Sequence, residues 1–545
     1  MKKVVLLFLC LLFIFQLTAN AAVKEFVVEG TYTMSELETP DIAKERAVEN
    51  AVWRACEQAG SYLESFSEIK NMQLSKEKLF AVSSAALTTT VISEKTEPAG
   101  NNQTMIKVQV RCFVSTEKVE AMRDQIDNKD IPTEFKNLQS DYENLQNELM
   151  QLKQQYSNSA TGQEQLTVKE KIAQNENAFK AMQKYREACD FFLNNNNGAA
   201  ISIMGEAINL DPNNDLYYFQ RGLFKSFEPM VLDQAIHDYN KAISLNPQRV
   251  ESFVFRGFVY ADIQEYELAV YDYTHAISIN PYYVLAYHQR GELYKKLALY
   301  DQALADYTKA IEIDPVNVDS YVSRAALYTD MRKYPQAFTD FNKAISINAN
   351  DWYIYFQRGY TYRQNKNHNA ALADFDKAIQ LNPNFAPSYI NRGSIYYFDL
   401  KNYNKAEENY RKASKLAPTR ANYYQLHAYA LAELKRYPQA LENHTNAISI
   451  ISLNENDIPK LAQAYSQRAY LYIQMNDLNS AIADYNSAIR LEPDNADYYL
   501  YRGDAYLALK QYEQAISSYE GYLKLNPTNQ QVRNFVEQLK RDTRK

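Results

Sequence analysis

The feature that most constrains this chain is an internal repeat, in which an arginine followed by glycine or alanine returns at a nearly constant interval. The small residues of six consecutive copies stand at 222, 257, 291, 325, 359 and 393, with spacings of 35, 34, 34, 34 and 34. A fixed period of this length is typical of stacked structural units that each contact only their neighbours. It predicts a repeat array rather than one closed core.

Each copy carries small and aromatic residues at helical spacing. In one copy these residues are Tyr287, Gly291, Tyr294, Ala303, Tyr307, Ala310, Ile311 and Pro315. The small residues allow two helices to approach closely and the aromatic rings fill the space between them, while the proline ends the second helix. The pattern therefore predicts a hairpin of two helices in every copy.

This pattern resembles the tetratricopeptide repeat at nearly every marked position. We count ten units over residues 181–529, with a degenerate first unit at 181–214, an insertion near 451–459 in the eighth, and a capping helix at 530–545. The resemblance implies a mostly α fold, an α-solenoid with the superhelical form of tetratricopeptide repeat proteins. It also implies binding of a protein or peptide partner in a concave groove.

In the family, the first helix of each unit lines that groove. The positions carried over are Phe219, Leu223, Val254, Phe258, Phe356, Tyr360, Ile390, Tyr397, Phe398, Tyr429 and Tyr470. Two aromatic regions would flank a more polar stretch at His288, Glu292, Lys295 and Lys296, which suits a peptide with apolar anchors. The alternative is that these aromatic residues pack against neighbouring repeats.

The repeated arginine departs from the family, where leucine is usual. An aspartate precedes the aromatic residue of the second helix in many units, at Asp238, Asp272, Asp306, Asp340, Asp374 and Asp484. One interpretation is a charged ladder that binds ligand. The interpretation that we favour is an arginine–aspartate pair inside each hairpin, which the eighth unit replaces with His427 and Asn443.

Residues 22–122 predict a separate small α+β domain. A strand near Phe26–Gly30, an alanine-rich helix over 43–59, a second helix over 76–86 and strands over 88–93 and 105–114 follow in order. This order resembles the N-terminal domain of flagellar assembly protein T and related envelope lipoproteins. Cys56 and Cys112 both point to its core, either as a disulfide or as two buried thiols.

Residues 123–180 form a helical linker. From Phe135 to Tyr156, apolar residues alternate steps of three and four, the seam of a short coiled coil. The seam at 135–156 either joins copies of the chain as a homo-oligomer or packs within one chain.

Residues 1–21 have the features of a signal peptide: Lys2 and Lys3, an apolar run, and Ala19-Asn20-Ala21 as a cleavage site. We expect an exported protein, periplasmic or extracellular, without stable membrane insertion. The net charge of −7 gives no reason to expect nucleic acid.

The sequence offers no motif for catalysis, a cofactor or a metal site, so we expect no enzyme and no cofactor. The prediction is an exported scaffold for a protein or peptide partner. The alternative is a module that binds an envelope polymer, such as peptidoglycan or a polysaccharide, with aromatic rings stacked on sugars.

Overall fold

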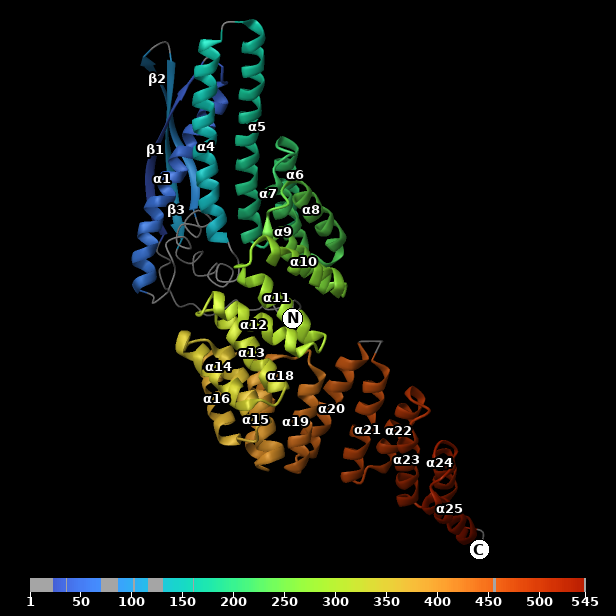
Figure 1. The fold of residues 1–545 in the computed structure, drawn as a ribbon. Coiled ribbons are helices and arrows are strands. Elements are labelled where there is room, and N and C mark those ends of the chain that lie inside the picture. The colour runs from blue at the N-terminus through green and yellow to red at the C-terminus, as the bar shows by residue number, and fades with distance from the viewer. Residues whose placement is uncertain are drawn as a thin grey trace. The chain divides into compact units, whose positions relative to one another are not determined.

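The computed structural model describes residues 23–35, 37–69, 87–100, 103–115, 131–159, 161–453 and 457–543. The predicted signal peptide at 1–21 and the predicted helix at 76–86 lie outside them. Two compact units divide the chain, 1–281 (unit 1) and 282–545 (unit 2). A small sheet precedes a long series of helix pairs, which confirms the predicted fold class (Figure 1).

Unit 1 begins with an antiparallel sheet in the order β1-β3-β2. The strands are β1 (Val23–Met34), β2 (Leu87–Gly100) and β3 (Gln103–Ser115). Helix α1 (Pro40–Ile69) packs on one face because β3 alternates, turning Val108 and Val110 toward the alanine stripe of α1. Both side chains have no exposed surface. The predicted alternation is therefore confirmed, while α1 is longer than the 43–59 helix that we predicted.

Gly30 in β1 is the closest point of contact between the sheet and α1. A Cβ atom at this position would lie 1.9 Å from the carbonyl oxygen of Ala47 and 2.9 Å from Cβ of Ala51. Only glycine allows the strand and the helix backbone to come this near.

Cys56 and Cys112 are both buried thiols, and no disulfide joins them in the described residues. Cys112 belongs to the core between β3 and α1. Burial raises the pKa of the Cys112 thiol to about 11. Of the two alternatives for this pair, the structure therefore supports two buried thiols that pack as small hydrophobic residues.

The coiled-coil seam packs within its own chain. It lies on α4 (Ile131–Asn158), which runs beside the long helix α5 (Gly162–Leu193) (Figure 1). Leu149 and Leu152 are buried against Val168 and Ile172 of α5. The side chains of Phe135 and Leu138 lie outside the described set, but the described seam residues face α5 and the α+β domain.

A buried group of charges fastens α1 to α4 and α5. Arg46 has no exposed surface, donates from Nη2 to Oδ1 of Asn175 at 3.0 Å, and lies 4.4 Å from the ring centre of Phe179. Glu38 forms an ion pair with Lys153 of α4, with 2.5 Å between Oε2 of Glu38 and Nζ of Lys153. Because breaking a buried pair leaves an uncompensated charge, these contacts tie the α+β domain to the linker helices. The α+β domain and the linker therefore share one core.

Three helix pairs complete unit 1. They are α5 with α6 (Asn197–Leu210), α7 (Asp215–Ser226) with α8 (Leu232–Leu245), and α9 (Val250–Asp262) with α10 (Tyr266–Ile279). A 3₁₀ turn, η1 (Pro229–Val231), joins the second pair. Helix α5 thus serves both the linker and the first repeat.

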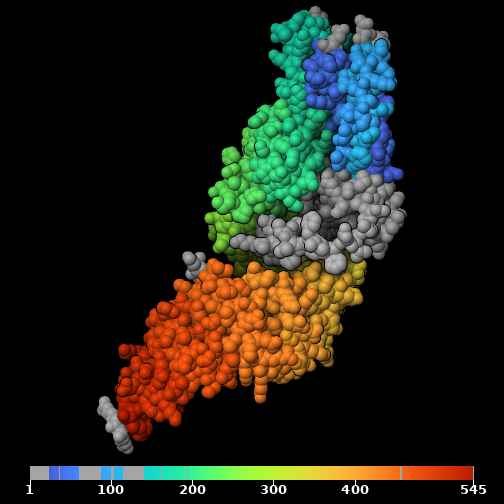
Figure 2. Space-filling model, turned by 180° about the vertical axis from the view of Figure 1, so that it is seen from behind, coloured from blue at the N-terminus to red at the C-terminus, as the bar shows by residue number. Residues whose placement is uncertain are grey.

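In the space-filling view the colour of unit 2 runs in chain order from yellow to red (Figure 2). This unit contains seven further helix pairs in its described residues. They are α11 (Val284–Lys296) with α12 (Tyr300–Ile313), α13 (Val318–Asp330) with α14 (Tyr334–Ile347), α15 (Trp352–Gln364) with α16 (His368–Leu381), α17 (Ala386–Ser394) and η2 (Ile395–Asp399) with α18 (Tyr403–Leu416), α19 (Ala421–Glu433) with α20 (Tyr437–Ser452), α21 (Ile458–Gln474) with α22 (Leu478–Leu491), and α23 (Ala496–Ala508) with α24 (Tyr512–Leu525). Helix α25 (Gln530–Thr543) follows the last pair, where Val536 is buried against Tyr519.

Most hairpins turn through one residue with a left-handed backbone. Ala298 and Arg332 are examples, each with φ of 58°. The amide of the next residue then bonds back to the last turn of the first helix, as Leu299 N does to Tyr294 O at 2.8 Å. This geometry satisfies the carbonyl groups at the end of a helix.

We predict that Gly30→Ala lowers the stability of unit 1 by more than ~2 kcal/mol, because the added methyl group must displace the α1 backbone. Thermal unfolding measured by circular dichroism checks it. Gly198→Ala is the control, since nothing lies within 4 Å of a Cβ there. Equal melting curves for the two variants would contradict the close approach.

Candidate functional site

The arginine column forms buried ion pairs inside the hairpins. Arg358 donates from Nε to Oδ2 and from Nη2 to Oδ1 of Asp374, both at 2.8 Å. Asp374 is only 5% exposed. The same two-point contact recurs at 221/238, 256/272, 290/306, 324/340 and 468/484. The structural interpretation of this column is confirmed.

Arg358 also contacts the repeat before it and two rings of its own helix. Nη1 of Arg358 donates to Asn342 at 2.6 Å, from the second helix of the preceding hairpin. Its guanidinium lies 5.7 Å and 5.8 Å from the ring centres of Tyr355 and Tyr362. One side chain therefore joins two helices of a hairpin and two successive repeats.

Three repeats of unit 2 lack the carboxylate at this place. Arg392 meets Asn409 in repeat seven, and Arg502 meets Ser518 in repeat ten. In repeat eight, Nε2 of His427 lies 3.1 Å from Glu407 of the preceding repeat. Burial lowers the pKa of His427, and Glu407 offsets part of that effect.

The predicted groove residues divide by exposure. Phe219 and Val254 are core residues, 2% and 0% exposed, so we correct their assignment to an open groove. Those that are partly buried are Leu223, Phe258, Phe356, Ile390, Tyr397 and Tyr429. Phe356, for example, contacts the rings of Phe375 and Phe385 in its own and the next repeat. For these residues the packing alternative holds at least in part.

The exposed members all belong to unit 2. Tyr360 is 37%, Phe398 49% and Tyr470 61% exposed. Tyr353 and Tyr501, which the sequence analysis missed, are 38% and 43% exposed on first helices as well. Tyr353 stands seven residues before Tyr360, two helical turns along α15, and that spacing is the signal that could have found it. We call these five residues the first-helix aromatic set.

In repeats four and ten, the residue after the small residue accepts a hydrogen bond from a buried tyrosine of the second helix. Tyr307 donates to Oε1 of Glu292 at 2.7 Å, and Tyr519 donates to Oδ1 of Asp504 at 2.7 Å. Although burial opposes it, hydrogen bonds from Ser323 and Tyr307 lower the pKa of Glu292. Glu292 is therefore an ionised carboxylate held by hydroxyl groups, part of the polar stretch that the sequence analysis placed in the groove.

Polar side chains connect neighbouring first helices in unit 2. Arg363 donates to Asn391 at 3.1 Å, and Gln425 donates to Gln467 at 3.0 Å. Such bonds between successive first helices fix their spacing.

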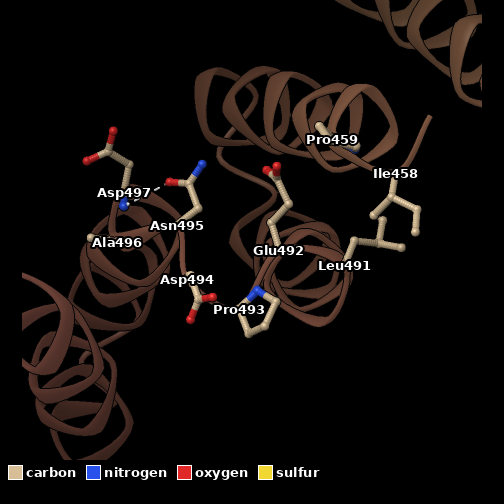
Figure 3. Close-up of a pocket in the computed structure, with 9 residues that line it drawn as sticks. All are labelled: Ile458, Pro459, Leu491, Glu492, Pro493, Asp494, Asn495, Ala496 and Asp497. Atoms are coloured by element: carbon tan, nitrogen blue, oxygen red, sulfur yellow. Dashed lines mark hydrogen bonds between the residues drawn. The ribbon is translucent and has the colours of Figure 1, made fainter. Parts of the chain in front are cut away.

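A separate shallow hollow of 690 Å³ opens where α21 begins (Figure 3). Ile458, Pro459 and Leu491 line one side, and Asp494 and Asp497 the other. It lies beside the insertion of the eighth repeat and is broadly open to solvent. It contains none of the predicted groove residues. Its carboxylates face solvent, so it offers no enclosed site.

The described residues contain no cluster of three or more metal-ligating side chains. His427 and His444 share a hairpin, and neither has the partners that a metal site needs. Nor does any described helix have the length and apolar character to cross a membrane.

This geometry defines a solenoid of antiparallel helix pairs. Tetratricopeptide repeat models match residues 284–317 and 352–385, 318–351 and 386–420, and 466–530. These parts of the chain are therefore tetratricopeptide repeats, the kind that generally serves as a protein-interaction scaffold. The matches do not reach residues 22–122, so the resemblance of that domain to flagellar assembly protein T stays a prediction.

Individual relatives are distant. A DnaJ homolog subfamily C member 7 homolog from Dictyostelium discoideum is 30% identical over 103 residues, 18% of this chain and 18% of the relative. A tetratricopeptide repeat protein from Parabacteroides merdae is 22% identical, over 46% of this chain and 98% of its own, with a TM-score of 0.39. YrrB, a tetratricopeptide repeat protein with an unusual peptide-binding site, is 23% identical, over 36% and 97%, with a TM-score of 0.29.

We predict that Arg358→Leu destabilises unit 2 by ~3 kcal/mol, because Asp374 stays buried without its cation. Arg358→Leu with Asp374→Leu should recover much of that loss. Arg392→Leu should cost less, because the buried partner of Arg392 is the neutral Asn409 and its charged partner Asp376 is exposed to water. Denaturant midpoints measure all three variants, and a double variant no better than Arg358→Leu would contradict the pairing.

A second prediction concerns pH. Burial, with a smaller effect of Arg468, lowers the pKa of His444 to about 4, against about 6.5 in an unfolded chain. The unfolded state therefore binds the proton first, so stability should be full above about pH 6.5 and fall toward pH 4. His444→Leu should flatten this slope in urea midpoints measured between pH 7.5 and 4.5. His237→Leu, at an exposed position, is the control and should leave it unchanged.

Proposed function

We propose that this protein is an exported scaffold that binds a protein or peptide partner along the first helices of unit 2. The observation that carries the proposal is the first-helix aromatic set, five large rings that are 37% to 61% exposed. Exposed aromatic side chains gathered on one kind of helix are typical of binding surfaces. Tyrosine is well suited because its ring provides contact area and its hydroxyl still reaches water.

The ion pairs support this assignment because they keep the arginine charges away from the exposed face. Because the arginines are bound to aspartates and rings within the array, they add little positive charge to the exposed face. The first helices of unit 2 carry the exposed rings of the first-helix aromatic set together with the partly buried amides of Asn391, Gln425 and Gln467. Such a surface suits an extended peptide, whose backbone offers donors and acceptors to amides and whose side chains contact rings.

Export rests on residues 1–21, and we propose a periplasmic or extracellular location on that ground. For assembly, the packing of Leu149 and Leu152 within the chain favours a single copy. The role that we propose is binding, without catalysis.

We predict that Tyr360→Ala with Tyr470→Ala weakens partner capture at least tenfold, because two exposed rings are removed without opening the core. Affinity capture of the mature chain, residues 22–545, from an envelope extract of the native cell, read by mass spectrometry, measures it. Tyr512→Ala is the matched control, since Tyr512 is 40% exposed on a second helix.

Unchanged capture by the double variant would contradict the binding surface. Retention of glycan fragments alone, or sedimentation with insoluble envelope material, would favour the polymer-binding alternative instead. Phe356→Ala would be a poor test of binding, because it also removes the ring contacts with Phe375 and Phe385 and so lowers stability.

A further inference from the structure

Repeat seven differs from its neighbours by one added residue in its first helix. Gly393 and Ala428 are 35 residues apart, while the four intervals directly before are 34. The structure accommodates this residue as the π-turn η2, in which the amide of Leu400 donates to the carbonyl of Ile395, five residues back, at 3.0 Å. Single π-turns inside helices are frequent at functional sites.

The π-turn gathers three aromatic rings. Tyr397 and Phe398 have ring centres 4.7 Å apart at an interplanar angle of 74°, and Tyr397 and Tyr403 are 5.3 Å apart at 63°. Phe398 is 49% exposed. The rings of Phe398 and Tyr403 thus both lie at a steep angle to the ring of Tyr397, and Phe398 is at the surface.

A carboxylate lies at the edge of these rings. Tyr397 donates its hydroxyl hydrogen to Oε1 of Glu433 in the next repeat at 3.4 Å. Burial, and then the charge of Glu433, raise the pKa of Tyr397 to about 12, so the hydroxyl keeps its proton. Glu433 is exposed. No lysine or arginine of the described chain forms an ion pair with it, while other carboxylates of the same region are paired.

The chain itself shows what such an arrangement binds. Arg358 lies between the rings of Tyr355 and Tyr362 and pairs with a carboxylate, and the same combination surrounds Arg290 and Arg468. At the π-turn the rings and the carboxylate are present, but no cation of the described residues lies over Tyr397, Phe398 or Tyr403. Lys405 instead lies over Tyr396, with Nζ 5.0 Å from the ring centre.

We propose that Tyr397, Phe398, Tyr403 and Glu433 form a receptor for an arginine side chain of the partner peptide. The inference rests on the proposed function and names one chemical feature of its ligand. A guanidinium is planar, so it stacks on an aromatic face while it donates to a carboxylate, and it is more weakly hydrated than an ammonium group. A lysine ammonium can also contact a ring and donate to a carboxylate, but it is not planar and it is more strongly hydrated.

The test begins with a random 12-residue peptide phage library selected on the full mature chain. Selection on the wild type should enrich arginine at one position. Selection on Phe398→Ser with Glu433→Gln should still enrich peptides, but without that arginine. Tyr512→Ala, away from the rings, should enrich the same arginine-containing peptides as the wild type.

A synthetic copy of the most enriched peptide then provides a direct measurement. Calorimetric titration should show about tenfold weaker binding when citrulline, a neutral isostere, replaces the arginine. Lysine at that position should fall between the two. The difference between arginine and citrulline should disappear in the Phe398→Ser, Glu433→Gln variant, whose melting curve verifies that it folds.

The outcomes separate the two proposals. Enriched peptides without arginine, or an arginine preference that the variant retains, would overturn the receptor alone. Failure of any peptide to enrich on the wild type would overturn the proposed function and the receptor with it.

Discussion

The buried arginine–aspartate pair holds this array together, and most of its other features follow from it. A helix pair with two charged groups at its centre is stable only if both charges are satisfied, because either one alone in the interior is costly. Here the aspartate receives two donors, the guanidinium stacks on two rings, and its remaining nitrogen contacts the repeat before it. The requirement for these partners at fixed positions explains why tyrosine and arginine recur together at a period of 34 residues.

Where the pair is absent, the array changes its local chemistry. Repeats seven and eight have Asn409 and Asn443 in place of aspartate, and repeat eight has His427 in place of arginine. The same two repeats contain the π-turn and the buried His444, whose lowered pKa predicts that this part of unit 2 loses stability in acid. A departure from the repeat therefore coincides with the exposed aromatic cluster that we propose as a receptor.

Unit 1 shows a different use of buried charge. Arg46, Glu38 and Lys153 join three segments that are far apart in sequence, a strand-bearing domain and two linker helices. Because helix α5 continues into the first repeat, this charged core places the small sheet at a fixed position on the start of the array. The linker is thus a structural part of unit 1.

The sequence by itself determined the repeat, the helix hairpins, the arginine–aspartate pairs and the alternation of β3, because each depends on short-range spacing along one or two neighbouring helices or strands. Tertiary structure decided which ring is exposed, since Phe258 and Tyr360 each follow the glycine of their repeat, yet Phe258 is partly buried and Tyr360 is 37% exposed. It also decided that the seam at Leu149 faces its own chain, because burial depends on contacts between residues distant in sequence. The π-turn belongs to the same class: the extra residue is visible in the spacing, but the direction of Phe398 follows from how the helix absorbs it.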